Sequence, residues 1–148
     1  MKIAHILLPT DLSEQARRAY ARACGLAKET GAKITLLSVV EDLPVAPRGA
    51  PFAPPIGDPD APAEAHALRE ALERERERLD ADVAVEVDTA IGAEVGETVA
   101  WYANEHGCDI ILMSTHGHSG LKRLLLGSVA EKILRHTVVP VLSIPPNE

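Results

Sequence analysis

Five short apolar segments, separated by stretches in which apolar residues recur at helical spacing, constrain the fold of this 148-residue chain most strongly. Segments 3–8 and 109–114 are almost entirely apolar, which is typical of strands buried on both faces of a sheet. Strands that alternate with helices pair in parallel, with right-handed crossovers over the sheet. The pattern therefore predicts a doubly wound α/β domain whose five-stranded parallel sheet has helices on both faces. The expected strands are 3–8, 33–40, 83–87, 109–114 and 139–144.

Four helices are expected between these strands. The first is expected to begin at a cap formed by Asp11 or Ser13 and to end at Gly31. The other three are expected at 63–80, 94–106 and 128–135. Because opposite charges such as those of Glu70 and Arg74 alternate on segment 63–80, we interpret its outer face as a solvated surface.

A Pro-rich segment, at about residues 43–62, interrupts the alternation. It holds seven of the eleven prolines, so no regular element is expected there. We expect it to be a loop within a single domain that spans residues 1–148. A loop of this length is usually either a lid over a site or an insertion without a function, and both interpretations stay open.

The charge balance excludes some classes of partner. Fifteen Lys and Arg residues against 22 Asp and Glu residues give a net charge of -7, which argues against non-specific nucleic-acid binding. Residues 113–148 nevertheless carry four basic and two acidic side chains, so a bound anion is expected near them. No apolar run approaches the roughly 20 residues of a membrane span, and the N-terminus does not resemble a secretory signal. We therefore expect a cytoplasmic protein without a membrane partner.

Cys24 and Cys108 show no metal-type spacing, and we predict that both are small buried hydrophobic residues.

A glycine-bearing loop after the fourth strand is the candidate binding segment. Gly117, Gly120 and Gly127 permit close approach of the backbone, and the next helix would present free N–H groups and its positive dipole end. Such a strand, loop and helix N-terminus can bind phosphate. Alternatively, Ser128 and Glu131 form a capping box that satisfies the helix end without a ligand, and the two interpretations can coexist.

Four motifs, in this order, resemble the universal stress protein family. They are ILLPTD at 6–11, DIILMS at 109–114, the G-x9-G-S spacing of Gly117, Gly127 and Ser128, and VPVL at 139–142. The similarity covers nearly the whole chain except the Pro-rich segment. It implies a Rossmann-like fold similar to that of the adenine nucleotide alpha hydrolases, homodimers joined through the last strand (139–144), and ATP binding at the strand ends in many members, with Mg2+ as a possible companion ion.

The resemblance also implies roles for individual residues. In ATP-binding members the motif is G-x2-G-x9-G-[S/T], and Ser114 stands here at the position of the first glycine. Gly117, Gly127 and Ser128 would hold the phosphates, and Val129 would offer its backbone N–H. The remaining implied contacts are Pro9 and Thr10 beside the base, Asp11 on the ribose hydroxyls, and Val39 and Met113 beside the adenine. From the sequence alone, the alternative for Asp11 is a helix cap completed by Glu14.

His118 lies in the same loop, and we include it among the nucleotide-binding candidates. Residues 115–118 (THGH) also resemble the adenylyl-transfer motif of nucleotidylyltransferases, but that motif follows the first strand and this segment follows the fourth. Two histidines on one loop are too few to predict a metal site.

A binding protein is favoured over a catalyst, because the sequence offers no convincing general base and no dedicated magnesium ligand. We expect an adenine-nucleotide-binding protein of stress response or signalling. One alternative is a homodimeric interaction protein of the same family that binds no nucleotide. The other is a weakly ATP-hydrolysing or nucleotidyl-transferring enzyme in which His118 acts.

Overall fold

A five-stranded, wholly parallel sheet forms the centre of the molecule in the computed structural model, which describes residues 1–50, 52–115 and 126–145. The strands lie in the order β3-β2-β1-β4-β5. Their bounds are β1 (His5–Pro9), β2 (Lys33–Glu41), β3 (Val85–Gly92), β4 (Ile110–Ser114) and β5 (Val141–Ile144). The predicted α/β fold with a parallel sheet is confirmed.

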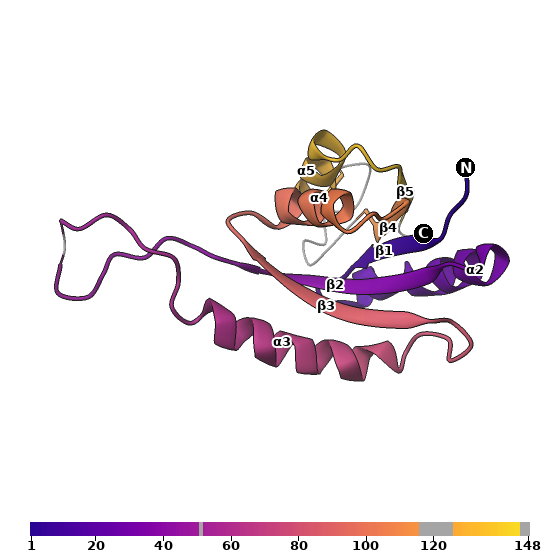
Figure 1. The fold of residues 1–148 in the computed structure, drawn as a ribbon, viewed down its shortest axis with the longest axis horizontal. Coiled ribbons are helices and arrows are strands. Elements are labelled where there is room, and N and C mark those ends of the chain that lie inside the picture. The colour runs from indigo at the N-terminus through magenta and orange to yellow at the C-terminus, as the bar shows by residue number, and fades with distance from the viewer. Residues whose placement is uncertain (51, 116–125, 146–148) are drawn as a thin grey trace.

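Helices cover both faces of this sheet. They are α1 (Glu14–Arg17), α2 (Tyr20–Thr30), α3 (Ala61–Arg76), α4 (Val95–Glu105) and α5 (Ser128–His136). Figure 1 shows α4 and α5 above the sheet and α3 below it. The chain winds from β1 outward to β3 and then returns to β4 on the other side of β1. The winding direction therefore reverses between β1 and β4, where ligands of such folds bind.

The central strand supplies side chains to both halves of the core. Ile6 and Leu8 belong to the cluster packed against α2 and α3, whereas Leu7 belongs to the cluster packed against α4 and α5. All three are fully buried. Burial of one such side chain stabilises the fold by about 1.5–3 kcal/mol. The apolar composition of β1 is thus explained by burial on both faces.

The predicted first helix is broken in two. Ser13 is its N-cap, and Gly31 ends α2 in the left-handed conformation (φ 75°), as predicted. Between α1 and α2, Arg18 N–H and Ala19 N–H donate to Gln15 O and Ala16 O respectively, three residues back. This tighter turn interrupts the α-helical pattern.

The predicted starts of β1, β3, β5 and α3 are each about two residues from the observed ones, and two predicted ends were wrong by more. α3 ends at Arg76 rather than at residue 80, because Arg78 N–H and Leu79 N–H donate three residues back and tighten the chain into a turn. β3 continues to Gly92 rather than stopping at residue 87, because its parallel pairing with β2 extends to Glu41 and Gly92. None of the described helices is long and apolar enough to cross a membrane.

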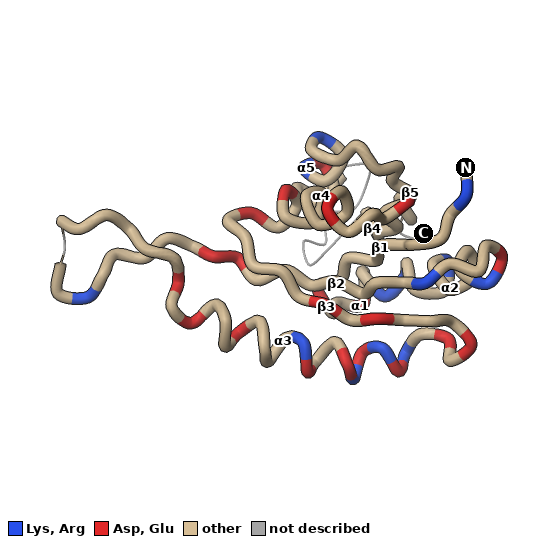
Figure 2. Tube along the Cα trace, viewed as in Figure 1, with Lys and Arg blue, Asp and Glu red and all other residues tan. Residues whose placement is uncertain are grey.

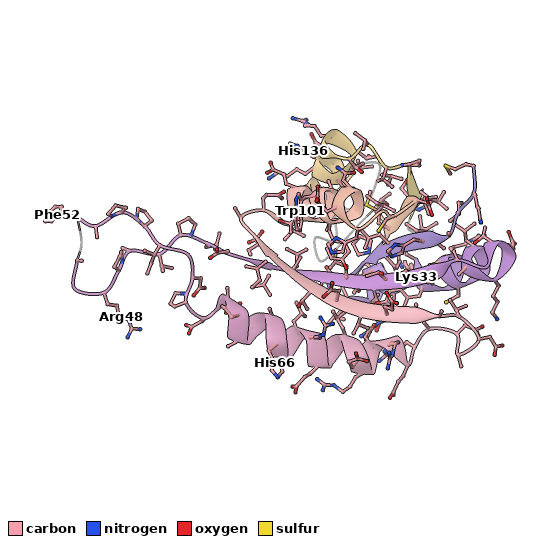
Figure 3. All side chains as sticks on the ribbon, viewed as in Figure 1. Lys33, Arg48, Phe52, His66, Trp101 and His136 are labelled. Carbon is pink, nitrogen blue, oxygen red and sulfur yellow. The ribbon has the colours of Figure 1, made fainter. Side chains whose placement is uncertain are left out.

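The Pro-rich segment projects from the body of the molecule (Figure 1). Its described residues form one isolated bridge, in which Val45 and Ile56 exchange backbone hydrogen bonds of 2.9 and 3.0 Å. At its base, Asp58 N–H donates to Asp42 Oδ1 at 2.6 Å. Figure 3 shows Phe52 at the far end, pointing away from the domain. The segment ends at Asp60, because α3 begins with Ala61.

A pair of glycines in and after α2 provides a test of this description. Gly31→Ala is expected to lower the free energy of unfolding by about 1 kcal/mol, because a Cβ disfavours the left-handed conformation. Gly25→Ala, inside the same helix, is expected to raise it by about 0.5–1 kcal/mol. No atom lies within 4 Å of an added Cβ at either position, so steric clash contributes to neither change. Urea unfolding measures both, and changes of the same sign would contradict the assigned end of α2.

Candidate functional site

A pocket of about 380 Å³ lies beyond the carboxyl ends of β1, β2 and β4, where the winding direction reverses. Eight of the ten residues predicted to bind nucleotide line it: Pro9, Thr10, Asp11, Val39, Met113, Gly127, Ser128 and Val129. The other two, Gly117 and His118, lie outside the described residues. Ser114, at the position of the first motif glycine, also lines the pocket. Ligand binding by these residues stays a prediction.

The turn between β1 and α1 forms one wall. Thr10 N–H donates to Leu37 O at 2.8 Å, and Thr10 Oγ1 accepts from Leu12 N–H at 3.0 Å. Leu12 has a φ of 64°, which is unusual for a residue with a large side chain. The two hydrogen bonds of Thr10 thus hold a backbone conformation that the sequence alone does not favour.

Asp11 lies at the exposed rim of this wall, and its proposed alternative role as a helix cap with Glu14 was wrong. Ser13 is the N-cap of α1, and its Oγ accepts from Ala16 N–H at 3.2 Å. Asp11 Oδ1 instead accepts from the N–H of Ser13 at 3.0 Å and from its hydroxyl. Glu14 pairs with Arg17. The carboxylate of Asp11 is therefore fixed by Ser13 through Oδ1, and no described residue donates to its second oxygen.

The start of α5 forms the opposite wall. Gly127 is the N-cap, and its N–H donates to Thr115 O at 3.0 Å. A Cβ at position 127 would lie 3.1 Å from that oxygen, so the glycine permits a close approach. Glu131 N–H donates to Gly127 O, whereas in the described part of the chain the N–H groups of Ser128, Val129 and Ala130 meet no acceptor. One of these three residues, Ala130, is buried, with only 3% of its surface exposed.

The predicted capping box of Ser128 and Glu131 was wrong. Ser128 is the first helical residue rather than the cap, and no side chain of the described residues caps the helix. The Glu131 carboxylate accepts instead from Arg135 at 2.6 Å. The capping box does not form because Gly127 is the N-cap. Ser128 is therefore the first residue inside the helix, one position after the cap. Among the described residues, three N–H groups at this helix end consequently remain without an acceptor.

Contacts between α4 and α5 keep this wall in place. A Cβ at Gly96 would lie 2.8 Å from Val129 O, so the glycine allows the two helices to pack closely. Glu94 caps α4 by accepting from Glu97 N–H at 2.8 Å, and it lies 3.2 Å from Lys132 Nζ on α5. Burial raises the pKa of Glu94, but these hydrogen bonds outweigh it and hold the pKa below its usual value. The carboxylate thus joins the helices as an ion pair.

The inner surface of the pocket is largely apolar. In addition to Val39 and Met113, it is lined by Leu37, Val95, Val99 and Ile133. These four residues were not predicted to belong to the site. Helical spacing predicts that Val95 and Val99 are buried, but it does not show that they face a cavity. The pocket therefore combines an apolar interior with a carboxylate on one wall and three N–H donors on the other.

Among the described residues, neither a cluster of metal ligands nor an exposed thiol is present. They contain no group of three His, Cys, Asp or Glu side chains that could hold a metal ion. Cys24 and Cys108 are buried, as predicted, and burial raises the pKa of the Cys108 thiol to about 11.

The Pro-rich segment does not line the pocket in its described part. Arg48 is the basic residue of segment 43–60 and lies on the projecting part (Figure 3), and Figure 2 shows acidic residues where that part joins the domain. The lid interpretation stays a prediction.

Comparisons with known proteins identify the family. The family model described as "Universal stress protein family" matches residues 2–145. The chain is 32% identical, over 150 aligned positions, to universal stress protein A homolog 1 of Coxiella burnetii, with 97% of both chains covered. The structure of the universal stress protein UspA from Lactobacillus plantarum matches with a TM-score of 0.77 at 23% identity, covering 97% of this chain and 99% of that chain.

Two further structures with the same fold are described as complexes. One is a universal stress protein in complex with cAMP (TM-score 0.66, 23% identity, 99% of this chain and 100% of that chain). The other is the universal stress protein from Archaeoglobus fulgidus in complex with dAMP (TM-score 0.63, 17% identity, 97% and 99%). From the family match over residues 2–145 and the full-length relative, this chain belongs to the universal stress protein family.

Proposed function

We propose that the pocket binds an adenine nucleotide, with ATP as its main ligand, and that the chain serves as a nucleotide-binding protein in stress response or signalling. The observation that carries this proposal is a set of three N–H groups at the start of α5, those of Ser128, Val129 and Ala130, for which the described residues supply no acceptor; we call it the N–H triplet. It borders a pocket with an apolar interior and a carboxylate on the facing wall. These three features are complementary to the phosphates, the base and the ribose of a nucleotide, respectively.

The N–H triplet suits the phosphates. Main-chain N–H groups and the positive end of the helix dipole both attract anions. Each hydrogen bond to a charged oxygen contributes about 1.5–3 kcal/mol. Gly127 allows the backbone to lie close to Thr115 at this point. On the resemblance to the family motif, we propose that Gly117 and His118 complete the phosphate site.

The remaining walls suit the nucleoside. Val39 and Met113, together with Pro9 and Thr10, offer a mainly apolar surface for the base. The Asp11 carboxylate can accept hydrogen bonds from the ribose hydroxyls. A volume of about 380 Å³ falls within the range of about 300–1,000 Å³ that is common for small-molecule sites.

The two related complexes support this assignment of ligand class. The proteins described as holding cAMP and dAMP share the fold of this chain. Both ligands contain an adenine base and a phosphate, the two groups for which this pocket has complementary walls. We propose that any Mg2+ arrives with the phosphates, since the described residues provide no cluster of metal ligands.

Binding is favoured over catalysis. Asp11 is the one ionisable side chain among the described residues that line the pocket. It lies on the wall opposite the N–H triplet, where the phosphates are proposed to bind. We assign that carboxylate to the ribose, which leaves no other ionisable side chain in the described lining to serve as a base at the phosphates.

Ser128→Pro tests the N–H triplet directly. Proline is well tolerated at the first position of a helix, and the extended ψ of Gly127 (154°) is compatible with a following proline. The substitution removes one N–H donor from the proposed phosphate site. Calorimetric titration with ATP, with and without Mg2+, is expected to show roughly 10- to 100-fold weaker binding, because one charge-assisted hydrogen bond is lost.

Ser128→Ala is the matched control, because it removes the hydroxyl and keeps the N–H. Its ATP affinity is expected to stay within about threefold of that of the unmodified protein. Equal losses in the two variants would assign the effect to the side chain and contradict phosphate binding by the N–H triplet. No heat of binding at millimolar ATP in the unmodified protein would favour the alternative of a family member that binds no nucleotide.

We also propose a homodimer joined through residues 139–144. β5 lies at the edge of the sheet and pairs only with β4 among the described strands. Leu142 is 42% exposed on it, and Val138 just before it is almost fully exposed. An exposed apolar edge strand is a ready template for pairing with another chain.

Leu142→Asp is expected to shift the protein from dimer to monomer in analytical ultracentrifugation, because it places a charge in the proposed interface. The matched control is Ile91→Asp on β3, the strand at the opposite edge, where the side chain is 43% exposed. The control is expected to remain dimeric. Dissociation by both variants would point to general destabilisation, and dissociation by neither would remove β5 from the interface.

A further inference from the structure

A buried network of polar side chains connects the turn between β1 and α1, which forms one wall of the pocket, to helix α3. Tyr20, the first residue of α2, is 5% exposed, and its hydroxyl oxygen lies 2.8 Å from Thr10 Oγ1. The same hydroxyl donates to Glu75 Oε1 on α3 at 3.1 Å. Arg17 binds Glu75 with two hydrogen bonds, from Nε at 2.6 Å and from Nη2 at 3.1 Å. Tyr20 and Glu75 do not line the pocket.

In this network of polar side chains, the donor and the acceptor of each hydrogen bond can be assigned. Burial raises the pKa of Glu75, but hydrogen bonds from Arg17 and Tyr20 outweigh it and keep the carboxylate ionised. An ionised carboxylate can only accept, so the single hydroxyl proton of Tyr20 is donated to Glu75. The hydroxyl proton of Thr10 is therefore donated to Tyr20. Thr10 Oγ1 then has its lone pairs turned toward Leu12 N–H, from which it accepts at 3.0 Å.

The orientation of Thr10 Oγ1 affects the turn that contains Asp11. Leu12 holds a left-handed backbone conformation (φ 64°), which costs a leucine free energy and persists only when neighbouring contacts impose it. The hydrogen bond from Leu12 N–H to Thr10 Oγ1 is such a contact. Tyr20 orients that oxygen, and Glu75 and Arg17 orient Tyr20. The position of Asp11 at the pocket thus depends on a carboxylate located on another helix.

We propose that Tyr20, anchored by Glu75, is a positioning residue that sets the affinity of the pocket for the ribose of its nucleotide by fixing the turn at Asp11. This inference rests on the nucleotide site proposed above. Tyr20 makes no contact with the ligand itself and acts only through Thr10 and Leu12.

Tyr20→Phe tests the inference, because it removes one hydroxyl and leaves the ring and the Arg17–Glu75 pair in place. The matched control is Tyr102→Phe. Tyr102 is also 5% exposed and donates its hydroxyl to a carboxylate, Asp88 Oδ2, at 2.7 Å. It belongs to the core cluster packed against α4 and α5 and does not line the pocket. The two variants therefore lose the same group at equal exposure.

Two measurements separate positioning from general destabilisation. In the first, Tyr20→Phe is expected to bind ATP about two- to tenfold more weakly, as for the loss of one hydrogen bond, and 2′,3′-dideoxy-ATP within about twofold of the unmodified protein. In the second, amide hydrogen exchange by NMR is expected to be faster at Leu12 by a similar factor. Tyr102→Phe is expected to change neither the ATP affinity nor the exchange at Leu12.

Several results would overturn the inference. Unchanged ATP affinity in Tyr20→Phe would show that the turn does not need the hydroxyl, and equal weakening for ATP and the dideoxy nucleotide would show that the effect does not pass through the ribose. The same losses in Tyr102→Phe would reduce the effect to stability. If the unmodified protein binds neither nucleotide, the proposed function fails together with the ribose role. Exchange at Leu12 then reports by itself whether Tyr20 fixes the turn.

Discussion

Parallel hydrogen bonding of β1 to β2 on one side and to β4 on the other is the constraint on which the rest of the structure depends. It places β1 at the centre of the sheet, where its apolar residues Ile6, Leu7 and Leu8 are fully buried on both faces. It also brings the ends of β1, β2 and β4 to one edge. The turn at Asp11 and the start of α5 can therefore face each other across one pocket, although more than a hundred residues separate them in sequence.

Much of the fold could be predicted because its signals are local. Apolar runs such as 109–114 and the glycine that ends α2 identify buried strands and a helix end without reference to distant residues. The boundaries that were missed depend on partners. β3 extends to Gly92 because β2 pairs with it that far, and the break after Arg17 reflects a tighter turn that apolar spacing does not show.

The residues of the candidate site were also predicted in part, but from resemblance to family motifs rather than from local sequence signals. Motif residues such as Asp11 and Gly127 were located by resemblance, and the structure brings them to one pocket. The capping roles failed because a Ser-x-x-Glu pattern does not show which residue is the cap, and Gly127 rather than Ser128 takes that position. Tyr20 and Glu75 could not be found from sequence, because the contact joins residues 55 positions apart on different helices.

The location of β5 at one edge of a wholly parallel sheet has a geometric consequence for a dimer formed there. Main-chain pairing of the two β5 strands about a twofold axis perpendicular to the sheet would make those strands antiparallel. The carboxyl ends of the two sheets, and the proposed nucleotide pockets beyond them, would then point in opposite directions. The described lining of each pocket comes from one chain, so such a dimer would carry its two pockets at opposite ends of the joined sheet.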